Sequence, residues 1–242
     1  MGLFDLHSKN DMLRRIHDIP WSILPAWLMG KRLKILMYHS VSTNQFDPHA
    51  TSPHVFLQHM QALQDKQVVS LEEALVLMQA GSSLSNTYVI TFDDALLDFY
   101  MTAMPILQGF DYPVTMFVPT GLVGGKAIWD SYDKSKALMT WKQLGECQQW
   151  NVTFASHTLN HARLTECSDA VLMDELRTSL QMLADNLGQM IPALAYPGGF
   201  HDERVRRVAQ DVGYICALGA SSRWGNGPES DLFQLRRERF KQ

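Results

Sequence analysis

The stretch VITFDDALLDFY, residues 89–100, decides how the chain is interpreted. Tyr88–Phe92 is a short apolar run of the kind that forms a strand buried on both faces. Asp93 and Asp94 follow at once, although neighbouring carboxylates repel one another and raise a pKa. A helix N-terminus would accommodate one of them, since Asp is a good N-cap residue. Two are better explained by separate tasks, one as a cation ligand and the other as a base.

Further apolar runs alternate with segments of helical spacing. The expected strands are Leu33–Tyr38, Tyr88–Phe92, Val114–Val118, Val152–Ala155, Ala193–Tyr196 and Tyr214–Leu218, with a weaker one at Leu232–Leu235. The expected helices are Val55–Leu63, Leu71–Met78, Thr140–Trp150, Ser168–Leu187 and Asp202–Val212. This alternation predicts an α/β fold with a parallel sheet, either closed as a barrel or open and doubly wound. No repeat or linker divides the chain, so one domain is expected.

The bulk properties exclude several classes of protein. The chain has 242 residues, of which 46% are hydrophobic and 19% charged, which favours a large packed core over disorder. A net charge of −4 gives no basic footprint for nucleic acid. The three cysteines are widely spaced and form no CxxC pair, so reduced thiols are expected.

The N-terminal region is expected to be an arm, residues 1–32, packed on the domain. It contains the apolar segment IPWSILPAWLMG, residues 19–30, which is too short to span a bilayer and holds two prolines. No secretory signal is recognised, which favours a cytoplasmic protein without a transmembrane segment. Contact of this arm with a membrane surface is the alternative.

Polar residues gather where four expected strands end. His39 follows the first run, Asp93 and Asp94 the second, His157 the fourth, and a Pro-Gly-Gly turn the fifth. Parallel sheets place their chemistry at this edge. His161 lies four residues after His157, and such a pair by itself is often a helix cap or a core residue. With Asp94 the two imidazoles would form a three-ligand site, most suited to zinc but also to cobalt or nickel.

These residues together resemble the polysaccharide deacetylases of the NodB-homology type, carbohydrate esterase family 4. The resemblance covers about residues 33–240 and rests on TFDD at 91–94, HTLNH at 157–161 and ALAYPGGFHDERV at 193–205. It implies a distorted (β/α) barrel of about seven parallel strands, formed by a domain over residues 33–242. The YPGG version of the third motif is similar to the branch that contains the poly-β-1,6-N-acetylglucosamine N-deacetylases.

The resemblance also implies a role for each matching residue. Asp93 would be the catalytic base, Asp94, His157 and His161 the metal ligands, and the Gly198 N–H part of an oxyanion hole. MYHSV at 37–41 matches the branch motif whose histidine is the general acid, which gives that role to His39. Arg237 would support the base in place of the arginine that the third motif lacks. The residues expected to contact substrate are Tyr196, Pro197, Gly199 and Trp224.

The resulting hypothesis is a metal-dependent hydrolase that removes N-acetyl groups from amino sugars of a polysaccharide or glycan precursor. One alternative is a non-catalytic carbohydrate-binding relative, suggested by the missing arginine, by the absence of a histidine after His201, and by Ala95 where the family usually has glycine. The other is an amidohydrolase acting on a small, non-polymeric amide. The remaining histidines are expected to play no part in the chemistry: His7, His17, His49, His54, His59 and, as an N-cap or weak substrate contact, His201.

Overall fold

The computed structural model describes residues 32–188, 190–221 and 225–240. The expected N-terminal arm therefore lies outside the described residues except for Arg32, and the proposed domain boundary stays a prediction. Seven parallel strands form the centre of the fold, as expected. In spatial order they are β1 (Lys34–Tyr38), β5 (Thr87–Phe92), β6 (Val114–Val118), β7 (Val152–Ser156), β8 (Ala193–Ala195), β9 (Cys216–Ser221) and β10 (Leu235–Arg237).

The sheet curves until its first and last strands meet. The Met37 N–H donates to the Glu238 carbonyl at 2.9 Å, and the Glu238 N–H donates to the Ile35 carbonyl at 2.8 Å. These bonds bring the segment after β10 alongside β1 and nearly close the barrel. Two small additions stand outside this circle: β4 (Gln67–Val68) pairs with the start of β5, and β2 (Ser40–Val41) pairs with β3 (Ala50–Thr51).

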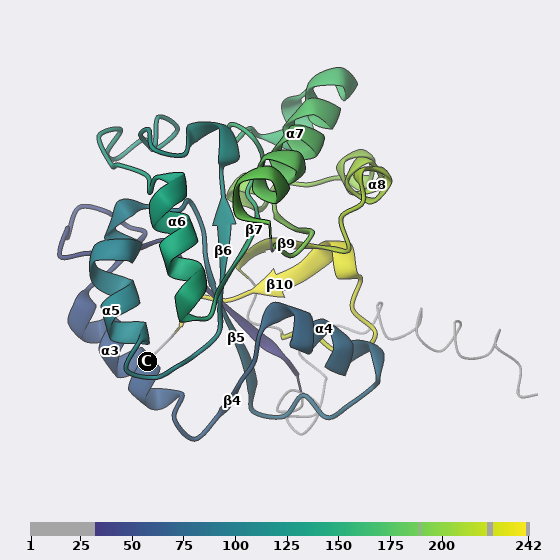
Figure 1. Cartoon of the computed structure of the whole chain (residues 1–242). Helices are drawn as coiled ribbons and strands as arrows, with labels where there is room; N and C mark the ends of the chain where they lie inside the picture. Colours follow the sequence, from purple (N-terminus) through teal and green to yellow (C-terminus); the bar gives the residue numbers. More distant parts are fainter. Residues whose placement is uncertain (1–31, 189, 222–224, 241–242) are drawn as a thin grey trace, which may run out of the picture.

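Helices surround the strands (Figure 1). They are α3 (Pro53–Ala62), α4 (Leu71–Gln79), α5 (Met104–Leu107), α6 (Trp141–Cys147), α7 (Asp169–Leu187) and α8 (Glu203–Val212). Five of them begin at a side chain that accepts a backbone N–H bond, which explains why the sequence signals located them. These N-caps are Ser52, Ser70, Thr140, Ser168 and Asp202. Among the described residues no helix is both long and apolar enough to cross a bilayer.

The structure differs from the sequence prediction at the last strand and in elements that were not predicted, which include α5 and the short strands β2, β3 and β4. The last strand was expected at Leu232–Leu235, but Leu232–Gln234 forms a 3₁₀ turn (η7) and the strand is Leu235–Arg237. Asp231 starts that turn, because its carboxylate accepts the Phe233 N–H at 2.8 Å. The π-helix Phe99–Ala103 (η2), which leads into α5, was not predicted.

Apolar side chains fill the space between the sheet and its helices. One cluster joins Phe92 of β5 to Phe56 of α3 and Leu144 of α6. Another joins Leu194 of β8 to Leu176 of α7 and Val205 of α8. Since these clusters fix each strand on its helices, the loops at the carboxyl ends of the strands start from rigid positions.

Candidate active site and metal centre

The expected site residues converge at the carboxyl ends of the strands. Most of them line one cavity of about 350 Å³, a volume typical of ligand pockets. His39 follows β1, Asp93 and Asp94 follow β5, and Arg237 ends β10. The other members that were expected from the sequence are His157, His161, Tyr196, Gly198 and Gly199.

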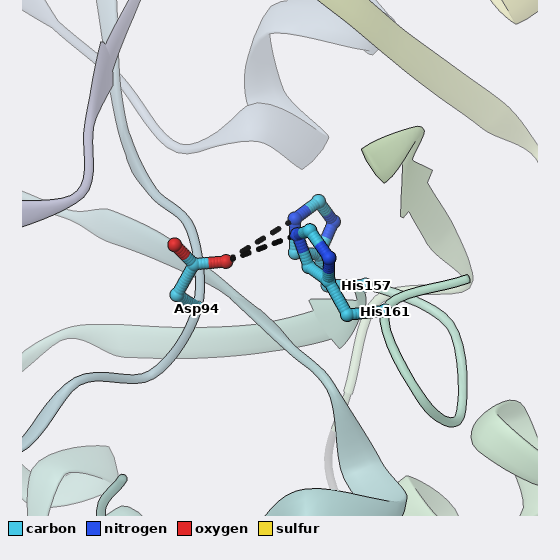
Figure 2. Close-up of side chains that lie close together, drawn as sticks. All are labelled: Asp94, His157 and His161. Atoms are coloured by element: carbon cyan, nitrogen blue, oxygen red, sulfur yellow. Dashed lines mark ion pairs between the residues drawn. The ribbon is translucent and has the colours of Figure 1, made fainter. Parts of the chain in front are cut away.

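Asp94, His157 and His161 form a compact cluster (Figure 2). Asp94 Oδ1 lies 3.5 Å from Nε2 of His157 and 3.5 Å from Nε2 of His161. The three ligand atoms all lie within 4.8 Å of one another. Tetrahedral zinc bonds of about 2.0–2.1 Å place ligand atoms about 3.3 Å apart, so this cluster fits one ion after a small closure.

The histidines are held in the form that binds metals. His157 Nδ1 lies 2.8 Å from the Ala195 carbonyl, which can only accept, so Nδ1 carries the proton and Nε2 faces Asp94 with its lone pair. Burial lowers the pKa of His157, and it lowers the pKa of His161 to about 2. Both imidazoles are therefore neutral at neutral pH, as metal ligation requires.

Asp94 has the surroundings of a carboxylate that needs a cation. Among the described residues its buried Oδ1 has no hydrogen-bond donor. Burial raises the pKa of Asp94 well above its usual range, and the neighbouring Asp93 carboxylate adds to the rise. The donor chemistry of the cluster and this unsatisfied oxygen both fit a divalent metal ion.

Asp93 lies beside the cluster and has a different partner. Its two oxygens accept from Arg237 Nη1 at 2.6 Å and from Arg237 Nη2 at 2.8 Å, a bidentate pair in which both side chains are buried. Arg237 is fixed in turn, since its Nε donates to the Gly219 carbonyl at 3.0 Å. Burial would raise the pKa of Asp93, but Arg237 and the nearby histidines hold it well below its usual range. Asp93 therefore stays ionised next to Asp94.

His39 also lies beside Asp93. Its Nε2 is 3.8 Å from Asp93 Oδ2. Burial lowers the pKa of His39 to about 3, although the Asp93 charge opposes this effect. The ring of His49 lies 5.0 Å from that of His39, and His49 Nδ1 accepts from Arg239 Nη2 at 2.9 Å.

The Tyr196–Gly199 turn forms another part of the cavity. Gly198 and Gly199 line it with φ of +64° and +75°, a conformation that favours glycine. Tyr196 also borders the cavity, but its side chain is buried and its hydroxyl donates to the Phe233 carbonyl at 3.0 Å. Pro197 is buried. Trp224, expected to contact substrate, lies outside the described residues.

One wall of the cavity was not anticipated from the sequence. The segment 126–137 supplies Trp129, whose indole stacks on the His161 ring at 4.3 Å and 15°. Lys136 fastens this segment by donating to Asp130 and to Asp47, each at 2.6 Å. His49, Tyr132 and Arg239 complete the wall. No short motif marks these residues, because they come from loops that only the fold brings together.

Comparison with known proteins agrees with this arrangement. The family described as polysaccharide deacetylase matches residues 81–217, more than half of the chain. YxkH of Bacillus subtilis (strain 168), whose name places it among the polysaccharide deacetylases, is 28% identical over 208 residues, which are 82% of this chain and 70% of that protein. The poly-β-1,6-N-acetyl-D-glucosamine N-deacetylase of Staphylococcus aureus (strain MSSA476) is 25% identical over 189 residues, 75% of this chain and 64% of that protein.

Solved structures share the same fold. The Streptococcus pyogenes deacetylase PplD, in complex with acetate, is 29% identical with a TM-score of 0.74, over 86% of this chain and 92% of that one. IcaB from Ammonifex degensii has a TM-score of 0.76 at 22% identity, over 88% of this chain and 93% of that one. With the family match across the strands that carry Asp93, Asp94, His157 and His161, the chain belongs to the polysaccharide deacetylase family.

Proposed function

We propose that the protein is a metal-dependent N-deacetylase that hydrolyses the acetamido group of amino sugars in a polysaccharide or glycan precursor. The observation that carries this proposal is the pairing of two unlike carboxylates at one strand end. Asp94 joins two neutral histidines around an unsatisfied oxygen, while Asp93 remains ionised against Arg237. A ligand set beside a free base is the arrangement that metal-assisted amide hydrolysis requires.

The nature of the substrate is supported by the relatives. The Staphylococcus aureus protein is named for deacetylating poly-β-1,6-N-acetyl-D-glucosamine, and this chain spans 64% of its length. We therefore propose N-acetylglucosamine units as the first substrates to test. The cavity of about 350 Å³ and its polar lining suit a sugar unit that carries an acetamido group.

Asp94, His157 and His161 would hold the metal ion, most suitably zinc. When bound there, the ion would supply Lewis acidity that polarises the amide carbonyl and eases deprotonation of water. Asp93 would accept the proton of the attacking water through one carboxylate oxygen. Water oxygen bonds to the carbonyl carbon as that proton leaves, and the C–N bond then breaks with its electron pair on nitrogen.

The departing nitrogen needs a proton to leave as an amine. His39 is the candidate donor, with Nε2 3.8 Å from Asp93 Oδ2. Because burial lowers the pKa of His39 to about 3, we propose that His39 is neutral before the reaction and is protonated by way of Asp93. It then delivers that proton to the nitrogen, and the products are acetate and a free amine.

The developing negative charge on the carbonyl oxygen would be stabilised by the Gly198 N–H. In the turn, the Gly199 N–H is already bonded to the Tyr196 carbonyl at 2.8 Å. Gly198 borders the cavity with a φ of +64°, a backbone conformation that glycine adopts without strain. Gly199 and Tyr196 would shape the sugar pocket beside it.

The test is metal content of the purified protein combined with acetate release from β-1,6-linked N-acetylglucosamine oligomers, before and after chelation. We expect about one zinc ion per chain and acetate release that stops on chelation and returns with zinc. Asp93→Asn should abolish release while metal stays bound, and Asp94→Asn should lose the metal. His39→Ala should reduce turnover by ~10²–10⁴-fold, the size of one acid–base contribution.

Three results would change the proposal. Retained activity in Asp93→Asn would remove its role as base. Metal binding without acetate from any glycan, but with hydrolysis of small N-acetyl compounds, would favour the amidohydrolase alternative. Metal and glycan binding without any hydrolysis would favour a non-catalytic carbohydrate-binding protein.

A further inference from the structure

We propose that Glu175 of α7 is a positioning residue of the metal centre, and that its buried carboxylate holds the His157–His161 loop and sets the affinity of that loop for a divalent cation. The inference rests on the proposed metal-dependent function. It concerns a residue that lies 14 positions beyond His161 and does not touch the ligand cluster itself.

The loop that carries the histidines has a strained backbone. Thr158 and His161 have φ of +67° and +57°, values in the left-handed region. A non-glycine residue in this region costs about 1–2 kcal/mol, so two of them within four residues persist only if surrounding contacts hold them. One of the strained residues is a ligand, and any relaxation of this backbone would turn the imidazole of His161 away from Asp94.

Glu175 supplies much of the required restraint. Its Oε2 accepts the backbone N–H of Asn160 at 2.8 Å, and its Oε1 accepts the side-chain Nδ2 of Asn160 at 2.8 Å. The backbone carbonyl of Glu175 also accepts the Leu159 N–H at 3.1 Å. Three hydrogen bonds from one residue therefore fix the two positions that immediately precede His161.

The opposite side of the loop is closed as well. The Gly121 N–H donates to the Leu159 carbonyl at 2.8 Å, and a Cβ on Gly121 would lie only 2.9 Å from that oxygen. The loop is thus clamped between α7 and the short η3 turn (Thr120–Leu122). Because Gly121 occupies one side, removing Glu175 would release the loop on the other.

The burial of Glu175 makes this restraint mutual. Its side chain is buried, and each of its two carboxylate oxygens accepts a hydrogen bond from Asn160. A buried carboxylate is costly unless such bonds satisfy it. The bonds that hold the loop therefore also satisfy Glu175, so a movement of the loop would leave a buried carboxylate without donors.

The experiment measures zinc affinity of the metal-free full chain by competition with a chromophoric chelator. The variants are Glu175→Gln, Glu175→Ala and Asn160→Ala, and the control is Asp174→Asn, which removes the neighbouring, exposed carboxylate of the same helix. We expect zinc binding about 10–100-fold weaker in Glu175→Ala, the usual effect of losing a residue that orients a ligand. Glu175→Gln and Asn160→Ala should each lose less, since each keeps part of the restraint, and Asp174→Asn should match the wild type.

A spectroscopic measurement separates positioning from general stability. Cobalt bound to the wild type and to each variant should give visible absorption that differs in Glu175→Ala, because His161 no longer meets the ion at the same angle. The urea midpoint of each metal-free variant, measured in parallel, identifies any that is unfolded. If Glu175→Ala does not fold, the decision falls to Glu175→Gln and Asn160→Ala.

Unchanged zinc affinity and cobalt spectra in the folded Glu175 and Asn160 variants would overturn the inference and leave the proposed function intact. Metal binding by the wild type without deacetylation would defeat the proposed function, while the Glu175 affinities would still decide the inference. Absence of zinc and cobalt binding by the wild type would overturn both.

Discussion

Asp93 and Asp94 are neighbours in the chain, yet their carboxylates have opposite surroundings. Arg237 holds the pKa of Asp93 low against the effect of burial, whereas burial and the Asp93 charge raise the pKa of Asp94. Asp94 has a positive φ of +73°, and its side chain points toward His157 and His161 (Figure 2). The two aspartates thus differ because Asp93 is paired with Arg237, whereas Asp94 faces two histidines. These surroundings suit Asp93 to the proposed role of base and Asp94 to that of metal ligand.

Replacing Arg237 should affect Asp93 first. In Arg237→Lys the bidentate pair is lost, and in Arg237→Gln the buried carboxylate has no countercharge, which we expect to destabilise the fold by about 3–5 kcal/mol. Because burial then dominates, the pKa of Asp93 rises, and the acid limb of the pH–rate profile should move to higher pH.

The measurement is kcat/KM from pH 4 to 9 with urea unfolding alongside. Arg207→Gln, an exposed arginine on α8, is the matched control and should change neither. An acid limb in Arg237→Gln that coincides with the wild type would show that the charge of Arg237 does not hold the pKa of Asp93 low.

Trp129 should contribute to metal binding through its contact with His161. Aromatic contacts of this kind are worth about 0.5–1.5 kcal/mol, so Trp129→Ala should weaken zinc binding roughly two- to tenfold, and Trp129→Phe should restore most of the loss. Trp150→Ala, at an exposed tryptophan, serves as control for zinc affinity measured by chelator competition. If all three variants bound zinc as tightly as the wild type, Trp129 would line the cavity without contributing to metal binding.

At the scale of single elements, the turn after β8 joins fold and site. A Cβ on Gly199 would lie 2.2 Å from the Ala220 Cβ and 2.5 Å from the Ala220 backbone nitrogen, so it meets the rigid strand β9. A Cβ on Gly198 would instead meet the Phe200 ring at 2.7 Å, and that half-exposed ring, which packs against the Arg163 guanidinium, can shift more easily than a strand backbone. The two glycines should therefore respond differently to the same change.

Gly199→Ala should be destabilised by two effects. Alanine in the left-handed backbone region costs about 1–2 kcal/mol, and overpacking against β9 costs about 1–3 kcal/mol more. Gly198→Ala should be destabilised mainly by the left-handed backbone and should remain folded, but its acetate release should fall because a methyl group pressed against the Phe200 ring would shift the turn that presents the Gly198 N–H. Urea midpoints and acetate release of both variants check this. A Gly198→Ala enzyme with full activity would argue against an oxyanion role for this turn.

The elements show where sequence reasoning works and where it stops. The strand Val114–Val118 was located correctly, and the helices with a Ser, Thr or Asp cap were predicted to start within two residues of their observed starts, because these signals are local. The end of α6 was predicted at Trp150, but the helix ends at Cys147 and continues as a 3₁₀ turn. The final strand was misplaced because Leu232 and Phe233 are apolar like strand residues, while the Asp231 cap turns them into a 3₁₀ turn. The π-helix at Phe99–Ala103 has no comparable local signal.

The same contrast holds within the site. Motif spacing placed the Asp94, His157 and His161 cluster, and the motif resemblance suggested Arg237. The contact of His49 with His39 and that of Trp129 with His161 were not predicted, since neither comes from a motif. That His49 takes no part in the chemistry stays a prediction. Contacts between residues in separate loops depend on the closed barrel, which periodicity does not encode in detail.

For the whole molecule, burial of histidines predicts sensitivity to acid. The pKa is lowered by burial at His39, His49, His59, His157, His161 and His201, to about 3 at His39 and about 2 at His161. A histidine whose pKa is lower in the folded than in the unfolded state takes up its proton at higher pH in the unfolded chain. The free energy of unfolding therefore falls as pH drops below about 6.5. The raised pKa of Asp94 acts in the opposite direction and offsets part of this fall.

We expect the metal-free protein to lose about 2–4 kcal/mol of stability between pH 7 and pH 5. Urea unfolding at half-unit intervals of pH, with chelator present, measures the loss. His39→Gln should flatten the dependence, whereas His54→Gln, at an exposed position of α3, should leave it unchanged. Stability that is constant down to pH 5 would contradict the expectation.

Closure of the barrel has a consequence for the order in which the molecule is assembled. Asp93 ends the second strand of the sheet, while its counterion Arg237 ends the last, 144 residues later. An intermediate in which β1 to β9 are in place but β10 is not would contain the complete Asp94, His157 and His161 cluster. Its Asp93 carboxylate would still lack the positive charge of Arg237. Pairing over such a separation is slow to form. The proposed hydrolysis would therefore become possible only after the final strand has joined the sheet and Arg237 has paired with Asp93.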